Sequence, residues 1–159
     1  MIYEYWLACL KNISDRKKKM LRKAYGSAKE IYYIEETQLK MQKFLAEKDI
    51  ECIKAAKKQK DLEEKYQNMK EKGIRFIPYF SKDYPERLGQ FSDAPYALYV
   101  KGKLPDENRP SVAIIGARRC SAYGEGQALE YGKCLAAAGV QVISGMALGI
   151  DGAGHRGAL

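Results

Sequence analysis

The stretch that decides the fold of this chain holds two short apolar runs, each followed by a glycine-bearing polar turn. The first reads Ser111-Val-Ala-Ile-Ile-Gly116-Ala-Arg118-Arg119-Cys-Ser121-Ala-Tyr123-Gly124, and the second reads Val142-Ile-Ser144-Gly145-Met-Ala-Leu-Gly149-Ile-Asp151-Gly-Ala-Gly-His155-Arg-Gly-Ala-Leu159. In α/β folds, a strand that breaks into such a turn and then opens a helix points backbone N–H groups at a phosphate. We therefore expect a phosphate-binding edge here.

The two apolar runs predict parallel strands at 112–115 and 140–143. Between them, small and apolar residues at spacings of three and four predict a helix from about Gly124 to Ala138, which Gly139 ends. The three elements form one βαβ unit, which is expected to be right-handed. Because no third parallel strand follows, the sheet is expected to be incomplete and the chain to be the front part of a longer protein.

Upstream of this unit, the runs Ile74–Pro78 and Ala97–Lys101 have strand composition, and 104–110 is predicted to be a connecting loop. Residues 1–72 lack proline and hold a single glycine, Gly26, so successive helices are expected. Helix caps are predicted at Ser14, Gly26 and Ser27, a helix start at Thr37, and one long helix from about Asp49 to Lys72. We expect a helical domain over 1–72 and an incomplete Rossmann-like domain over 73–159.

The composition is basic, with a net charge of +8 over 159 residues. Residues 1–72 carry 18 Lys and Arg against 12 Asp and Glu, a net charge of +6. Excess basic charge suits polyanions, although lysine-rich helical surfaces are often merely solvated. No apolar run approaches a membrane span and no signal peptide is recognisable, so a cytoplasmic protein is expected. The four cysteines are scattered and there is one histidine, so no metal site is expected.

The two glycine-bearing segments resemble the DprA/Smf family of DNA-processing proteins. Members carry a strand that ends in Gly-x-Arg-x-x-Ser-x-Tyr-Gly, matched here at Gly116, Arg118, Ser121, Tyr123 and Gly124. They then carry a Ser-Gly-x-Ala-x-Gly-Ile-Asp-x-x-Ala-His-x-x-Ala-Leu segment. This chain matches it throughout except at Gly154, where the family usually has alanine. The resemblance is strong from about residue 73 onward and weak before.

This resemblance implies single-stranded DNA binding and loading of the RecA recombinase during natural transformation, the DNA uptake of competent cells. It implies an extended Rossmann-like domain behind a helical domain of SAM or helix-hairpin-helix character, with no cofactor and no catalytic turnover. Full-length members form homodimers. The paired glycines with which helix-hairpin-helix turns grip DNA are absent around Gly26. A packing role is therefore expected for the first helices.

We expect the nucleic-acid-binding residues at the two strand ends. The family arginine that matches Arg118 contacts DNA phosphate, and its planar guanidinium suits phosphate oxygens. The alternative is a structural arginine paired with Asp151 or Glu125. The other candidates, which supply N–H groups, a hydroxyl or a stacking ring, are Gly116, Ser121, Tyr123, Gly124, Ser144 and Gly145. Ser121 is also suited to capping the helix, and Tyr123 to packing at the edge of the sheet.

Two enzyme interpretations compete with DNA binding. The first is a Rossmann-like nucleotide-processing enzyme of the LOG/lysine-decarboxylase-like group, whose Pro-Gly-Gly-x-Gly-Thr-x-x-Glu motif does not occur here. The second is a hydrolase using Ser144, Asp151 and His155, although Val142 occupies the first glycine position of a nucleophile elbow. The match of 152–157 to Gly-x-Gly-x-x-Gly begins too far after the strand for a dinucleotide site. We therefore expect a protein that is not an enzyme.

Overall fold

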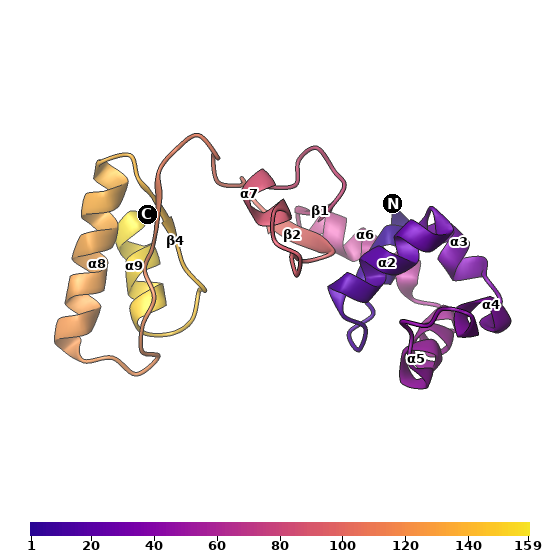
Figure 1. The fold of residues 1–159 in the computed structure, drawn as a ribbon. Helices are drawn as coiled ribbons and strands as arrows, with labels where there is room; N and C mark the ends of the chain where they lie inside the picture. The colour runs from indigo at the N-terminus through magenta and orange to yellow at the C-terminus, as the bar shows by residue number, and fades with distance from the viewer. The chain divides into compact units, whose positions relative to one another are not determined.

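The computed structural model describes all residues from Met1 to Leu159 as a mixed structure of helices and two small sheets (Figure 1). The chain divides into two compact units, a first unit of Met1–Leu104 and a second unit of Pro105–Leu159. Helices predominate in the first unit. The second contains the two glycine-bearing turns.

Six helices open the first unit: α1 (Ile2–Ala8), α2 (Asp15–Tyr25), α3 (Ala28–Tyr33), α4 (Glu36–Lys40), α5 (Glu47–Lys57) and α6 (Leu62–Glu71). Short polar sequences set their ends. The Ser14 hydroxyl accepts the N–H of Lys17, and the Ser27 hydroxyl accepts the N–H of Glu30, as N-cap residues do. Gly26 ends α2 with a φ of 81°, a conformation that suits glycine. These three predicted caps are confirmed.

The prediction of a single helix from Asp49 to Lys72 is wrong. The structure breaks it into α5 and α6 at an exposed polar turn, 58–61. The reason lies in the apolar residues on either side of the turn. Ile53 and Leu62 both pack into the core of the first unit, whereas nine residues of continuous helix, at about 100° each, would point them in opposite directions. The turn thus brings both side chains to the same core.

The two lead-in strands are confirmed as β1 (Ile74–Pro78) and β2 (Ala97–Lys101), but they form an antiparallel pair of their own. A short helix, α7 (Glu86–Gly89), lies between them in the sequence. Tyr96, just before β2, is buried within the helical core. The hairpin therefore belongs to the first unit, and the boundary between compact units lies after Leu104 and not at the expected 72/73.

The second unit holds β3 (Ser111–Ala113), α8 (Ala122–Ala137), β4 (Gln141–Ile143) and α9 (Ile150–Ala158). The strands β3 and β4 pair in parallel, so the predicted βαβ connection is present. Helices α8 and α9 lie side by side (Figure 1). Glycines permit this approach, because a Cβ on Gly132 would lie 2.3 Å from the carbonyl oxygen of Gly154.

Candidate nucleic-acid edge of the second unit

The two glycine-bearing turns meet at one carboxylate. Asp151, at the start of α9, is buried and accepts the backbone N–H of Gly116 at 3.3 Å and that of Gly145 at 3.1 Å. Gly116 follows β3 and Gly145 follows β4, so one side chain ties the ends of both strands to α9. We call this region, residues 114–124 and 144–151, the strand-end edge.

Hydrogen bonds from backbone N–H groups stabilise the ionised form of Asp151. Burial alone would raise the pKa of this carboxyl, but hydrogen bonds from the backbone N–H groups of Gly116, Gly145 and Ala147 outweigh it and lower the pKa. Asp151 therefore stays ionised at neutral pH. Met146, between two of these donors, has a φ of 53°, a strained value for a residue other than glycine.

Two of the predicted glycines make room for α9. A Cβ on Gly116 would lie 2.7 Å from Cγ1 of Ile150, and one on Gly124 would lie 3.3 Å from its Cδ1. The Ile150 N–H also donates to the carbonyl of Ala117 at 3.3 Å. These glycines thus allow α9 to begin against both the β3 turn and the start of α8.

The two predicted serines have local partners. Ser121 is the N-cap of α8, and its hydroxyl accepts the Gly124 N–H at 3.1 Å. The Ser144 hydroxyl donates to the carbonyl of Ile114 at 2.6 Å and so links the ends of the two strands. The sequence predicts Asp151 only as a partner of Arg118 or as a member of a triad. Its contacts with the Gly116 and Gly145 N–H groups are a finding of the structure.

Among the candidate residues, Arg118 and Tyr123 carry the long side chains that are exposed to solvent. Arg118 lies in the turn between β3 and α8, is exposed and has no hydrogen-bond or ion-pair partner. Its two alternative partners are engaged elsewhere, because Asp151 binds backbone N–H groups and Glu125 pairs with Arg156 at 2.6 Å. Tyr123, in the first turn of α8, is 77% exposed and packs against no other ring. The edge therefore offers a free guanidinium and a free aromatic face.

The geometry narrows which N–H groups can bind an anion. Those of Gly116 and Gly145 already donate to Asp151, so an incoming phosphate would have to compete with an internal carboxylate. The start of α8 also presents backbone N–H groups, and helix N-termini favour anions. The groups at this edge that remain available to an anion are the N–H groups at the start of α8 and the guanidinium of Arg118.

Comparison with known proteins places these turns in a family. The model of the family described as DNA recombination-mediator protein A matches residues 75–159. The chain belongs to this family. Protein Smf of Borreliella burgdorferi is 40% identical over 79 residues, 50% of this chain and 25% of that protein. Protein Smf of Escherichia coli is 41% identical over 83 residues, 52% of this chain and 22% of that protein.

The DNA processing protein DprA of Bacillus subtilis is 32% identical over 115 residues, which make up 67% of this chain and 39% of that protein. The chain thus spans about a quarter of the two Smf proteins and about two fifths of DprA. The family match runs from β1 to the end of α9 and contains every candidate site residue. No helix is both long and apolar enough to span a membrane.

The glycine repeat at 152–157 has a packing role in this family member. All three glycines lie inside α9, well after β4, and not at the end of a strand. A Cβ on Gly154 would lie 2.8 Å from Cγ2 of Ile114, and one on Gly157 would lie 2.0 Å from the carbonyl oxygen of Leu129. The repeat lets α9 approach β3 and α8 closely. The His155 Nε2 atom is buried without a hydrogen-bond partner, so no proton relay connects it to Ser144.

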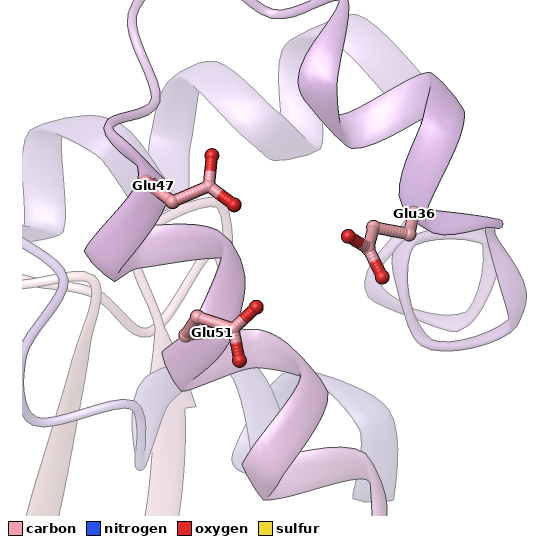
Figure 2. A group of neighbouring side chains, drawn as sticks. All are labelled: Glu36, Glu47 and Glu51. Carbon is pink, nitrogen blue, oxygen red and sulfur yellow. The ribbon is translucent and has the colours of Figure 1, made fainter.

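A group of three carboxylates lies far from the family's turns in the sequence. Figure 2 shows Glu36 of α4 facing Glu47 and Glu51 of α5. Lys54 bridges two of them, with its Nζ 2.8 Å from Glu36 and 2.9 Å from Glu51, and Lys40 binds Glu36 at 2.7 Å. Hydrogen bonds from the two lysines lower the pKa of Glu36 to about 2. Because ammonium groups already pair with Glu36 and Glu51, we interpret the group as a surface ion-pair network.

Proposed function

We propose that this chain binds single-stranded DNA through the strand-end edge of the second unit. Membership of a DNA recombination-mediator family supports this proposal. The observation that carries it is that the strand-end edge exposes both the unpaired guanidinium of Arg118, in the turn after β3, and the ring of Tyr123, in the first turn of α8. Ligands of open α/β sheets bind at that end of the strands.

In this proposal each candidate residue has a distinct role. Arg118 and the N–H groups at the start of α8, next to Ser121, hold a backbone phosphate, and Tyr123 stacks on a base. Gly116, Gly124, Ser144 and Gly145 shape the edge through Asp151 and Ile150. The role requires neither a cofactor nor catalytic turnover.

The proposal extends to the architecture and partners of the family. We propose that the second unit is part of a Rossmann-like domain, that the whole protein loads RecA onto single strands, and that it acts as a homodimer. Direct binding of purified RecA to the chain, in the presence and absence of an oligonucleotide, tests the recombinase contact. Sedimentation equilibrium tests the dimer.

The decisive experiment is substitution of Arg118. Arg118→Ala should weaken binding of a labelled single-stranded oligonucleotide by about 1.5 to 3 kcal/mol, the range for hydrogen bonds to charged groups, and leave the melting temperature nearly unchanged. Arg156→Ala is the matched control, because it removes the same charge from the same unit but from a guanidinium already paired with Glu125. Equal losses in both variants would show that only net charge matters.

A competition assay separates DNA binding from the nucleotide-enzyme alternative. NAD, AMP and ATP at micromolar concentrations should not displace the oligonucleotide, whereas unlabelled single-stranded DNA should. Affinity should also fall as salt rises, because phosphate contacts release counterions. Displacement by a mononucleotide would favour an enzyme that processes nucleotides.

A further inference from the structure

A groove of about 660 Å³ lies on the first unit, where α1, the end of α3 and the turn after α5 come together. Its lining combines aromatic and basic side chains: Tyr3, Tyr32, Tyr33, Lys57, Lys58 and Lys60. We call it the tyrosine groove. None of these residues belongs to the strand-end edge, and all precede the segment that the family model matches.

The three tyrosine rings form one packed cluster. The ring centroid of Tyr3 lies 5.1 Å from that of Tyr32 and 5.7 Å from that of Tyr33. The centroids of Tyr32 and Tyr33 are 5.3 Å apart. Beneath them, Tyr32 packs edge-on against the buried Trp6 at 5.0 Å. Tyr33, the outermost ring, is 65% exposed. The cluster thus presents an aromatic surface anchored to the core.

Hydrogen bonds fix this aromatic surface in place. The hydroxyls of Tyr3 and Tyr33 lie 2.8 Å apart, and the Tyr32 hydroxyl donates to the carbonyl of Lys57 at 3.2 Å. The Lys57 ammonium in turn donates to the carbonyl of Ile34, at the end of α3, at 2.7 Å. Because the rings are already ordered, a ligand that stacks on Tyr33 loses little side-chain entropy from the protein.

The basic side of the groove has unpaired charge. Lys58 and Lys60 are exposed and have neither an ion-pair nor a hydrogen-bond partner. One carboxylate, Glu63, also lines the groove, against three lysines. The lining is therefore net positive. This combination of free ammonium groups and an exposed ring is the one with which single-strand binding surfaces hold phosphates and stack bases.

We propose that the tyrosine groove is a second binding site for single-stranded DNA, with a base on the ring of Tyr33 and phosphates at Lys58 and Lys60. The proposal rests on the proposed function, since single-stranded DNA is its ligand, but it uses different residues in a different unit. A duplex is the weaker match, because its base faces are stacked on one another and cannot reach a tyrosine ring.

Photochemical cross-linking tests the site on the full chain. Ultraviolet irradiation with single-stranded oligothymidylate, followed by mass spectrometry of tryptic peptides, should yield two cross-linked regions, one with Tyr32 and Tyr33 and one with Tyr123. Cross-links at Tyr123 alone would overturn the tyrosine groove and leave the proposed function standing. No cross-link at either region, together with no measurable binding, would overturn both.

Two sets of variants measure the contribution of the groove. Tyr33→Ala should weaken oligothymidylate binding by about tenfold, within the range for loss of one stacked base, whereas Tyr33→Phe should retain affinity. Lys58→Gln with Lys60→Gln should reduce the slope of log affinity against log salt by about 1.4, the value for two single-strand phosphates. Lys43→Gln with Lys48→Gln is the matched control, since these exposed lysines lie outside the groove.

The control pair should change affinity less than twofold. A control pair that matches the groove pair would show that general charge, and not the groove, holds the strand. Equal losses for Tyr33→Ala and Tyr33→Phe would likewise overturn the proposal, because a stacked ring needs no hydroxyl. So would a duplex that binds as tightly as the single strand and loses as much affinity on Tyr33→Ala.

Discussion

The two units of this chain bury their apolar residues to very different extents. The first unit closes a core of large side chains, with Leu7, Leu21, Ile31 and Ile53 fully buried. In the second unit the buried apolar residues are two alanines, Ala128 and Ala153. Its larger apolar residues stay exposed, among them Val112, Ile115, Tyr131, Ile143, Met146 and Leu148.

The two units differ in how much of their apolar surface their own elements can cover. Amphipathic helices cover one another, so the first unit satisfies its own apolar faces. Parallel strands are normally covered on both faces, and a sheet of two strands leaves much of its apolar surface in water. Ile115, which follows β3, is 74% exposed, and Ile143 in β4 is 41% exposed. The second unit is thus the part of the chain with least burial to stabilise it.

The largest expected effect is on the units taken separately. A fragment of 1–104 should be monodisperse and unfold cooperatively, whereas 105–159 should be partly molten or aggregate, because exposed apolar strands pair with other chains. Light scattering and amide exchange on the two fragments measure this. If the 105–159 fragment were monodisperse and well protected from amide exchange, this difference between the two units would be contradicted. A second pair of fragments, 1–72 and 73–159, divides the chain inside the first unit. The structure assigns the β1–β2 hairpin to that unit, and 1–72 lacks it.

The next effect concerns the close contact between α8 and α9. Gly132→Ala should destabilise the second unit by about 1 to 3 kcal/mol, the usual cost of overpacking, because its Cβ would meet the Gly154 carbonyl. Gly126→Ala in the same helix meets nothing within 4 Å and should stabilise the unit by about 0.5 to 1 kcal/mol. Amide exchange in α8 distinguishes the two. Similar behaviour of both variants would mean that the helices are not in contact.

A buried polar cluster distinguishes the first unit. Glu4 accepts hydrogen bonds from Arg22 at 3.0 Å and from the hydroxyl of Tyr96, which joins the hairpin to the helices. Glu4→Gln should lower the free energy of unfolding by about 1.5 to 2 kcal/mol, since it removes the charge that Arg22 pairs with. Denaturant unfolding measures the change. Glu36→Gln, in the exposed ion-pair network, is the control and should have a smaller effect, because solvent screens surface ion pairs.

The titration of the two buried aspartates is expected to have the smallest effect on stability at neutral pH. Burial would raise the pKa of Asp49, but hydrogen bonds from Lys17 and from the Ala46 N–H lower it, and the pKa of Asp151 is likewise lowered. Carboxyls with lowered pKa values stabilise the folded state above the ordinary value of 3.8, and this contribution is lost as pH falls through their folded-state pKa values.

Acid should therefore weaken both units below the ordinary aspartate range. In the second unit, protection of the Gly116 and Gly145 amides should fall with the protonation of Asp151. Amide exchange between pH 7 and pH 2 follows both units at once. In Asp151→Asn, which keeps only one acceptor oxygen, at least one of those two amides should be poorly protected already at pH 7, and both should change little with acid. Protection that is unchanged at pH 7 in this variant would show that the carboxylate does not anchor the turns.

Much of the local structure could be predicted from short sequence patterns. The caps at Ser14 and Ser27, the end of α2 at Gly26 and the strands β1 and β2 all follow from residues within a few positions of one another. The break between α5 and α6 could not be predicted in this way. Its turn has no glycine or proline, and it exists because Ile53 and Leu62 reach the same core.

The same distinction between local patterns and long-range contacts applies to the candidate site. The sequence by itself determined the family motifs, the order of strand, turn and helix, and Arg118 as a candidate phosphate contact, whereas the exposure of Arg118 comes from the structure. Tertiary structure alone decided that Asp151 takes the N–H groups of Gly116 and Gly145, that the hairpin packs with the helical unit, and that Tyr3 and Tyr33 meet across 30 residues. The physical reason is that caps, turns and strand periodicity are local interactions, whereas these contacts join residues that only the folded chain brings together.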